Sequence, residues 1–379
     1  MAAAPDAAAR AADVAAEVPG IAAQHLSAWR YRSFERYELD LDPGTTVLVG
    51  HNAAGKTNLV EALQLLTAGV SFRRPSPAEL VREGRDAGRI ELALAGEGRV
   101  LERACVLEQT RRAFERNGKR VRTSGIRGVL PSVLFCPDDL DMVKRSARVR
   151  RDALDAFGIQ LNAQYAKLVS AYTRTVEQPN NLLKEPTVDP MMLEVWDSAL
   201  ASAGAALLVH RRALLERVRA HLVEACARIA PRERVDVRYV STVGELPSTR
   251  PEIEERMAAA LSASRADDMR RGCTHVGPHR DEILFTIDGR PARDFGSQGQ
   301  QRSLVLAWKL AEVRVTRDIL GRYPLLLLDD VMSELDADRR AAMLEQVEAG
   351  IQTVITTTNL GYFSEDVLDR AKVVHVDGA

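Results

Sequence analysis

The segment Val47-Leu48-Val49-Gly50-His51-Asn52-Ala53-Ala54-Gly55-Lys56-Thr57-Asn58 decides the fold of this chain. An apolar strand runs into a glycine-lysine-threonine turn, and a helix is predicted to follow. The spacing lets backbone N–H groups surround a triphosphate at a helix N-terminus, where unpaired amides and the helix dipole favour negative charge. We therefore expect the residues from Gly50 to Asn58 to bind ATP, with Lys56 on the β and γ phosphates and Thr57 on Mg²⁺.

Composition limits what else the chain can be. It has 379 residues, 46% of them hydrophobic, which suffices for two domains. The formal net charge of −1 means that any nucleic-acid binding must depend on local clusters. The four cysteines are far apart and form no Cys-x-x-Cys pair, which favours buried thiols in a reducing compartment over a zinc site. No run approaches ~18 uninterrupted apolar residues, so we expect a soluble, unexported protein with no membrane partner and a disordered extension over residues 1–20.

A second apolar strand, Leu325 to Leu328, ends in the acids Asp329 and Asp330. Buried carboxylates without partners are costly, which favours a functional interpretation. In sites of this type the first acid holds a Mg²⁺-bound water and the second polarises the attacking water. We therefore expect Asp329 to join Thr57 at the metal and Asp330 to be catalytic with Lys56. A last buried strand leads to Thr357-Thr358-Asn359, whose hydroxyls are candidate sensors of the γ-phosphate.

Three further features have less specific patterns. Ser297-Gln298-Gly299-Gln300 opens a helix and predicts a second anion-binding turn, which meets the first either within one fold or across a dimer. Arg32 lies between two predicted strands and is either beside the nucleotide or solvated. His279, next to Arg280 and Asp281, is more typical of a hydrogen-bonded structural residue than of a catalytic one.

The most basic stretch surrounds the turn Asn117-Gly118 and predicts a hairpin. Its cations are Arg111, Arg112, Arg116, Lys119, Arg120, Arg122 and Arg127. Such cations add salt-dependent affinity for DNA phosphates without reading sequence. We take Arg111, Arg112, Lys119, Arg120 and Arg122 as the candidate DNA contacts, a solvated hairpin as the alternative, and Arg148, Arg150 and Arg151 as the next place to look.

Helical periodicity dominates residues 138–271, where apolar residues recur on one face over Leu154 to Tyr172 and again over Met192 to Ala225. We expect an α-helical arm here, built as an antiparallel pair. It interrupts a head domain predicted for residues 21–137 and 272–379.

This order of elements resembles the ATP-binding-cassette ATPases of chromosome maintenance, and in detail the RecF family of bacterial recombination mediators. The resemblance rests on Gly50 to Asn58, Gly277 to Asp281, Ser297 to Gln301, Leu326 to Val331 with Ser333 to Asp336, Arg150-Arg151, Leu182-Leu183-Lys184 and Trp196-Asp197. Arg32 also matches the arginine of the family's first strand pair. The implied fold is an α/β ABC-type (P-loop) ATPase head with mixed sheets and an inserted α-helical arm.

The resemblance also implies a function. Members of this kind form ATP-dependent homodimers that sandwich two nucleotides, bind duplex DNA at single-strand/double-strand junctions, and work with RecR and RecO to load RecA. Ser297 and Gly299, with Gln300, would contact the γ-phosphate held by Lys56 of the other subunit. We expect a cytoplasmic, nucleoid-associated protein and a weak, DNA-stimulated ATPase, because Asp330 is shorter than the glutamate of many related sites.

The sequence departs from the family at a few positions. Ala53 stands where glycine is usual, Pro179 where an arginine is common, and Arg145 and Ala147 where glycine and proline are usual. Two alternatives remain. A transporter's nucleotide-binding subunit is disfavoured by the arm and the basic hairpin. A chromosome-scaffolding SMC head is disfavoured because SMC coiled coils are far longer than the arm.

Overall fold

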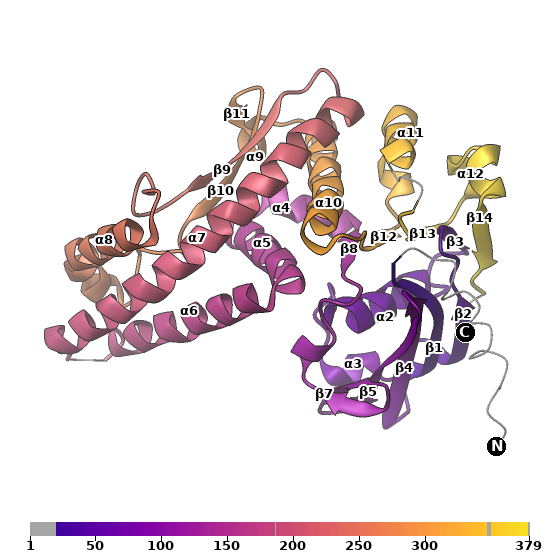
Figure 1. Cartoon of the computed structure of the whole chain (residues 1–379), viewed down its shortest axis with the longest axis horizontal. Coiled ribbons are helices and arrows are strands. Elements are labelled where there is room, and N and C mark those ends of the chain that lie inside the picture. Colours follow the sequence, from indigo (N-terminus) through magenta and orange to yellow (C-terminus); the bar gives the residue numbers. More distant parts are fainter. Residues whose placement is uncertain (1–19, 186, 347–349, 378–379) are drawn as a thin grey trace. The chain divides into compact units, whose positions relative to one another are not determined.

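The computed structural model describes residues 20–185, 187–346 and 350–377, so the disordered extension predicted for residues 1–20 lies, apart from Gly20, outside the described residues. The chain divides into two compact units (Figure 1). We call residues 1–139 and 312–379 the head unit, and residues 140–311 the arm unit.

Two sheets and a central helix build the head unit. Its elements are β1 (Ala22–Tyr31), β2 (Phe34–Asp40), β3 (Thr45–Val49), α2 (Lys56–Ala68), α3 (Pro77–Leu80), β4 (Ala87–Gly96), β5 (Arg99–Glu108), β6 (Arg112–Arg116), β7 (Lys119–Val121), β8 (Ser132–Phe135), β12 (Leu325–Asp329), α11 (Ala337–Gln346), β13 (Thr353–Thr357), α12 (Glu365–Asp369) and β14 (Ala371–His375). The antiparallel sheet has the strand order β2-β1-β4-β5-β6-β7, and the parallel sheet has the order β14-β3-β13-β12-β8.

Helix α2 packs against strands of both sheets, and this explains its composition. Leu59, Val60, Leu63 and Leu66 are all fully buried, as expected of a helix that is covered on opposite sides. The loop before α2, Asp330 after β12 and Thr358 after β13 follow neighbouring parallel strands. Because the carboxyl ends of parallel strands meet at one edge, the sheet itself brings the predicted site residues together.

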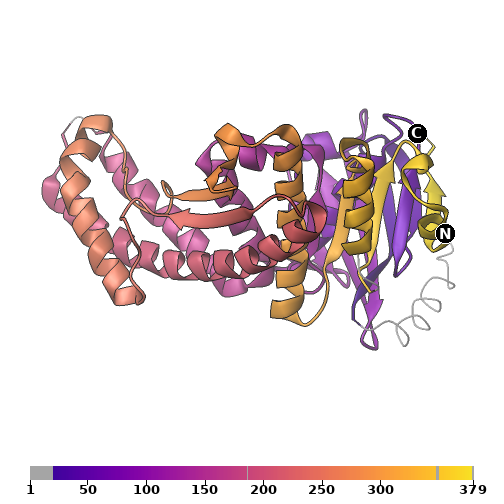
Figure 2. The same cartoon turned by 90° about the horizontal axis from the view of Figure 1, so that it is seen from above.

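Helices dominate the arm unit. Its elements are α4 (Asp141–Lys144), α5 (Ala147–Leu161), α6 (Ala163–Leu182), α7 (Pro190–Ile229), β9 (Val235–Val240), α8 (Arg250–Arg271), β10 (Glu282–Ile287), β11 (Arg290–Pro291), α9 (Ala292–Phe295) and the first part of α10 (Gln298–Leu320). Figures 1 and 2 show α6 and α7 side by side, and α8 also packs on α7. A Cβ on Gly204 of α7 would lie 2.4 Å from Met257 of α8 and 3.2 Å from Tyr172 of α6, so glycine permits this close packing. The antiparallel pair is present, but the sequence did not predict α8 or β9.

The arm unit extends further along the chain than the predicted arm. It continues from residue 272 to Ala311 because β10 pairs with β9, and Phe285 of β10 packs edge-on against Trp308 of α10 with ring centroids 5.2 Å apart. The functional assignment of residues 272–379 to the ATPase head stays a prediction.

One described helix meets the length and hydropathy criteria for a membrane span. It is Met191–Ile229 of α7, whose best window has a mean hydropathy of 1.4 and is 44% buried. The core helix of a water-soluble protein meets the same criteria, and α7 packs on α6 and α8 and carries the buried Arg211. The absence of a membrane partner stays a prediction.

A polar network fixes the turn before β10. The hydroxyl of Tyr239, the hydroxyl of Ser241 and both the N–H and hydroxyl of Thr242 donate to the carboxylate of buried Asp281. His279 lies 2.7 Å from the Tyr172 hydroxyl through Nδ1 and 3.1 Å from the Thr274 carbonyl through Nε2. Since a carbonyl only accepts, Nε2 carries the proton and Nδ1 accepts from Tyr172. Both ring nitrogens are thus hydrogen-bonded within the fold, which fits the structural interpretation of His279.

The buried salt bridge of Glu61 predicts a large effect on stability. Glu61 is fully buried and accepts from Arg32 at 2.8 and 2.7 Å, from Tyr31 and from Ser71. Glu61→Ala should lower the free energy of unfolding, measured in urea, by about 3 kcal/mol because it leaves the guanidinium without its charge partner. Glu108→Ala, which removes the exposed partner of Arg111, should leave it nearly unchanged, and equal losses in the two variants would contradict the prediction.

The burial of His279 predicts a pH dependence. Burial lowers the pKa of His279 to about 4, below its ordinary value near 6.5. Between these values the unfolded chain binds a proton that the folded chain does not, so stability falls as the pH falls from 7 to 5. His279→Gln should show a shallower decline in urea unfolding over this range. Exposed His210 is the control, and an unchanged slope in His279→Gln would refute the assignment.

Candidate nucleotide-binding site

The phosphate loop connects β3 to α2 through two left-handed residues, Ala53 (φ 65°) and Gly55 (φ 98°). A Cβ at Gly55 would lie 2.4 Å from the Phe34 ring, and one at Gly50 would lie 2.4 Å from the Val376 carbonyl oxygen. Glycine is therefore required at both positions. The left-handed conformation of Ala53 explains why the family that this chain resembles usually has glycine at this position. An alanine there lowers the stability of the fold by roughly 1 kcal/mol.

Lys56 holds the loop in shape. Its Nζ donates to the carbonyl of Gly50 at 2.7 Å and to that of His51 at 2.8 Å, and the side chain is buried. Burial lowers the pKa of Lys56, while the charges of Asp330 and Asp329 oppose that shift. The ammonium group therefore joins two loop carbonyls and feels the charges of two carboxylates.

Asp329 joins three elements of the site. Its Oδ1 accepts from the hydroxyl of Thr57 at 3.0 Å and from that of Thr356 at 2.9 Å. Burial raises the pKa of Asp329, and the hydrogen bonds from Thr356 and Thr57 oppose that shift. These contacts hold the loop helix, β12 and β13 at fixed spacing.

The donor set of Thr57 and Asp329 fits Mg²⁺. It consists of a hydroxyl and a carboxylate oxygen, and Mg²⁺ prefers oxygen ligands and commonly uses one or two carboxylates, waters and substrate phosphates. Among the residues that the structure describes, no three His, Cys, Asp or Glu side chains converge as a self-sufficient metal centre. A site completed by a phosphate group and water is the kind that these residues support.

Asp330 has a different environment from Asp329. It has a left-handed backbone (φ 53°), its N–H donates to the Thr356 hydroxyl at 2.9 Å, and its carbonyl accepts from Ser333. Asp330 lines a cavity next to the phosphate loop, whereas Asp329 is buried. The two acids thus have different surroundings, and the metal and catalytic roles expected of them stay predictions.

A cavity of about 190 Å³ lies over the loop. It is lined by Asn52, Ala53, Gly55, Lys56, Thr57, Asn58, Arg73, Asp330, Thr356 and Thr358. Of the other predicted loop residues, Gly50 and His51 provide carbonyls to Lys56, and Ala54 belongs to the hydrophobic core.

The cavity also contains Thr356 and Arg73, which are not part of the phosphate-loop motif. Of the two predicted threonine sensors, Thr358 lines the cavity and Thr357 does not. The Thr357 hydroxyl donates to the Asn359 carbonyl, because neighbouring residues of an extended strand face opposite sides. Thr356, which the sequence analysis left out, shares the face of Thr358. Arg73 donates to the Asn58 side chain at 2.8 Å, and no pattern in the sequence pointed to it.

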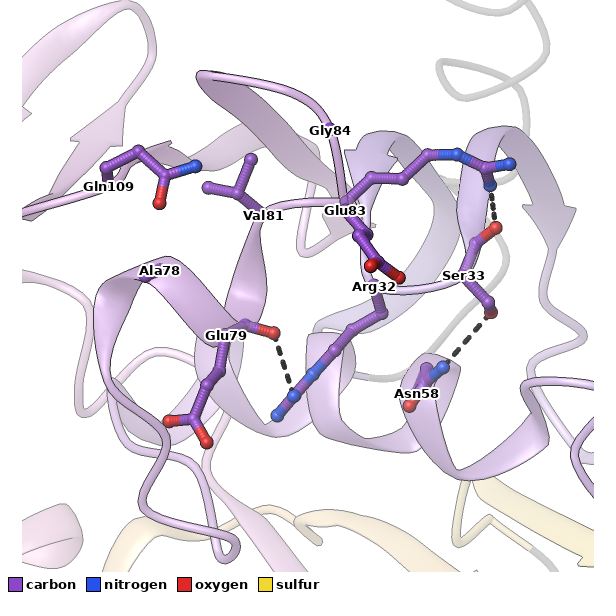
Figure 3. A pocket seen from close by; sticks show the side chains of 10 residues that line it. Arg32, Ser33, Asn58, Ala78, Glu79, Val81, Glu83, Gly84 and Gln109 are labelled. Carbon is purple, nitrogen blue, oxygen red and sulfur yellow. Dashed lines mark hydrogen bonds between the residues drawn. The ribbon is translucent and has the colours of Figure 1, made fainter.

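Arg32 lies beside a second cavity, of about 580 Å³, shown in Figure 3. Its guanidinium is held by Glu61 and by the Glu79 carbonyl at 2.8 Å, and it has a left-handed backbone (φ 51°). Ser33 and Asn58 also line this cavity, joined by a 3.2 Å hydrogen bond. Arg32 is therefore not a solvated arginine. Asn58 lines both cavities.

The Ser297 turn lies in the arm unit, at the start of α10. The Ser297 hydroxyl accepts from the Gln300 N–H at 3.3 Å, and the Gln300 side chain accepts from the Ser297 N–H at 2.9 Å. This reciprocal pair is a capping box, and it leaves Ser297 exposed at a helix N-terminus. Gly299 occupies the first turn of the same helix.

The basic hairpin is present as β6 and β7. Asn117 (φ 48°) and Gly118 (φ 71°) form the two-residue turn that left-handed residues favour. The strand register pairs Phe114 with Val121 and Glu115 with Arg120. Side chains alternate between the faces of a strand, so Lys119 shares the face of Phe114, and Arg120 lies on the opposite one.

The candidate DNA contacts differ in availability. Lys119, Arg120 and Arg122 are exposed, Arg111 is exposed but pairs with Glu108 at 2.7 Å, and Arg112 is partly buried. Among the alternative residues Arg148, Arg150 and Arg151, the prediction of a phosphate contact is wrong for Arg150. Arg150 is buried and makes two 2.7 Å hydrogen bonds to Glu282. Arg151 donates to the Asp281 carbonyl, whereas Arg148 is exposed.

Comparisons with known proteins agree on one family. The family model described as the RecF/RecN/SMC N terminal domain matches residues 23–377. DNA replication and repair protein RecF of Gloeobacter violaceus is 35% identical, with 92% of this chain and 94% of that protein covered. RecF of Symbiobacterium thermophilum is 39% identical over 90% and 91% of the two chains.

Solved structures give the same result. The structure of the recombination mediator protein RecF-ATPrS in the RecFOR pathway aligns with a TM-score of 0.84 and 29% identity, covering 92% of this chain and 95% of that one. An Smc head bound to the C-winged helix domain of ScpA aligns over 90% of each chain with a TM-score of 0.53 and 15% identity, which shows the fold alone. The fold is that of an ABC-type ATPase with mixed sheets. The chain belongs to the RecF/RecN/SMC family and, within it, to the RecF DNA replication and repair proteins.

Proposed function

We propose that this chain is an ATP-dependent DNA-binding protein of recombinational gap repair and replication restart. It dimerises on ATP around two sandwiched nucleotides, binds duplex DNA at single-strand/double-strand junctions, and assists RecA loading with RecR and RecO. Membership of the RecF proteins supports this, as does a related structure assigned to the RecFOR pathway with ATP in its name. The expected location is the cytoplasm, at the nucleoid.

The observation that carries the proposal is the cluster of Lys56, Thr57 and Asp329. Lys56 reaches the Gly50 and His51 carbonyls, and the Thr57 hydroxyl reaches Asp329. A cation, a hydroxyl and a carboxylate therefore meet at the N-terminus of α2, where unpaired N–H groups favour phosphate. This combination supports the binding of a nucleoside triphosphate with Mg²⁺.

The residues divide the chemistry among themselves. Mg²⁺ would supply charge neutralisation at the phosphates, held through Thr57 and Asp329. Lys56 exchanges its carbonyl partners for phosphate oxygens. Asp330 faces the cavity and orients the attacking water, with its backbone fixed by Thr356. The shorter reach of aspartate favours slow hydrolysis, so that ATP occupancy rather than rapid turnover is the working state.

The second half of the sandwich would come from another copy. Exposed Ser297 and partly exposed Gly299 and Gln300 form a helix N-terminus, at which Ser297 and Gln300 cap each other. An anion can replace that local capping without leaving a buried group unsatisfied. We assign this turn to contact with the γ-phosphate that the partner copy binds. Arg32, which Glu61 holds in place, would support the nucleotide from the side of the second cavity.

The basic hairpin is the proposed DNA contact. Exposed Lys119 and Arg120 lie on opposite faces of β7, and Arg122 is exposed just after that strand. We place the principal contact on Arg120 of β7 and on Arg122, which follows the strand, because both are exposed. The membership found above removes the transporter alternative, and the likeness to SMC heads extends only to the fold.

Substitution of the site residues should separate binding from hydrolysis. Asp330→Asn should keep ATP binding and ATP-dependent dimerisation in sedimentation velocity, but lower phosphate release about 100-fold or more, because general-base assistance is lost. Lys56→Ala should lose both. Exposed Asp338→Asn is the matched control and should behave as the unchanged chain. Fast hydrolysis by a permanent monomer would contradict the proposal.

Salt dependence should locate the DNA contact. Arg120→Ala with Arg122→Ala should weaken duplex binding and lower the slope of log affinity against log salt by about 2, roughly one unit for each DNA phosphate that the variant no longer neutralises. ATP affinity should not change. Arg36→Ala with Arg370→Ala removes two exposed charges from the same unit and should leave the slope unaltered. Equal slopes in both double variants would place the DNA contact elsewhere.

A further inference from the structure

One cysteine differs from the rest. All four lie within the described residues; Cys105, Cys136 and Cys226 are buried, and Cys273 is partly exposed. Burial raises the pKa of the Cys105 thiol to about 12, so that thiol stays protonated. Cys273 is located in the turn after α8, outside every element used for nucleotide or DNA binding above.

Two side chains contact the Cys273 sulfur. Its Sγ lies 3.7 Å from Nε2 of His275, and Arg280 donates to it through Nη2 at 3.4 Å. On the other side of the ring, Nδ1 of His275 lies 2.9 Å from Oδ1 of Asp268. Asp268 is itself fixed, because it also accepts from the His275 N–H at 3.0 Å and from the Ser264 hydroxyl at 3.0 Å.

The arrangement determines which nitrogen can act as a base. An ionised carboxylate only accepts, so Nδ1 of His275 carries a proton toward Asp268 and leaves Nε2 free to accept the thiol proton. Asp268 then stabilises the imidazolium, and Arg280 stabilises negative charge on sulfur. A sulfur nucleophile, a base and a carboxylate that orients the base together form an activated nucleophile.

We propose that Cys273 is a modification site, a nucleophilic thiol that reacts with hydroperoxides and small carbon electrophiles. With hydrogen peroxide, the sulfur attacks one oxygen, an S–O bond forms and the O–O bond breaks. The thiol proton passes to Nε2 of His275 and then to the departing hydroxide, giving sulfenic acid and water. The sulfur is oxidised by two electrons and the peroxide is reduced by two.

The position of the site links its redox state to the turn before β10. Arg280, which contacts the sulfur, also donates to the Thr274 carbonyl at 2.9 Å, and that carbonyl is the partner of His279. An oxidised sulfur adds an oxygen acceptor next to Arg280 and so competes for its hydrogen bonds. The inference is independent of ATP, DNA and every step of the proposed function.

Iodoacetamide labelling of the full, folded chain, followed by peptide mass spectrometry, tests the site without any substitution. Cys273 should be labelled about tenfold or more faster than the same cysteine in the urea-unfolded chain at the same pH, because the fold supplies its base. Hydrogen peroxide followed by a sulfenic-acid probe should mark the same residue first. A rate in the folded chain no greater than in the unfolded chain would overturn the proposal.

Two variants separate activation from mere exposure. His275→Gln should lower the folded labelling rate about tenfold while leaving Cys273 as exposed as before. His210→Gln, at an exposed histidine of α7 in the same unit, should not change it. An unchanged rate in His275→Gln, with circular dichroism showing a folded chain, would reduce Cys273 to an ordinary surface thiol and refute the inference.

Discussion

The head unit depends on one buried carboxylate. Asp329 accepts from Thr57 and Thr356, so a single side chain joins the phosphate-loop helix to two neighbouring strands of the parallel sheet. Removing an acid from water is costly unless hydrogen bonds replace the lost solvation. The two threonine hydroxyls provide them, and the same oxygen atoms form a suitable first contact for a hard cation. The folded structure and the proposed metal site therefore both require a carboxylate at position 329.

The parts of the structure that could be predicted from sequence are those that local chemistry determines. The loop from Gly50 to Thr57 has a spacing that only a few backbone paths satisfy, and the apolar strand before Asp329 could only be buried. The turn Asn117-Gly118 likewise requires left-handed residues, and the structure has them. Each of these signals lies within a dozen consecutive residues.

The features that were missed depend on contacts between distant residues or on strand faces. Arg73 meets Asn58, and Glu61 meets Arg32, through tertiary packing that no short pattern reveals. The sequence pattern indicates Thr357 instead of Thr356 as a cavity residue, because which of the two faces the cavity depends on where the strand begins. Helix α8 had a readable start, since Thr249 and Glu252 form a capping box, but its mean composition is polar and its periodicity weak.

The hydrogen bonds of Lys56 to its own loop have a kinetic consequence. An ammonium group that joins the Gly50 and His51 carbonyls holds the loop in the curvature that a phosphate chain requires. An arriving ligand therefore meets a preorganised cradle and loses little affinity to ordering of the backbone. On binding, Lys56 exchanges the two carbonyl oxygens for phosphate oxygens. The association rate should therefore approach the diffusion limit, and site occupancy should follow the triphosphate concentration in the cell.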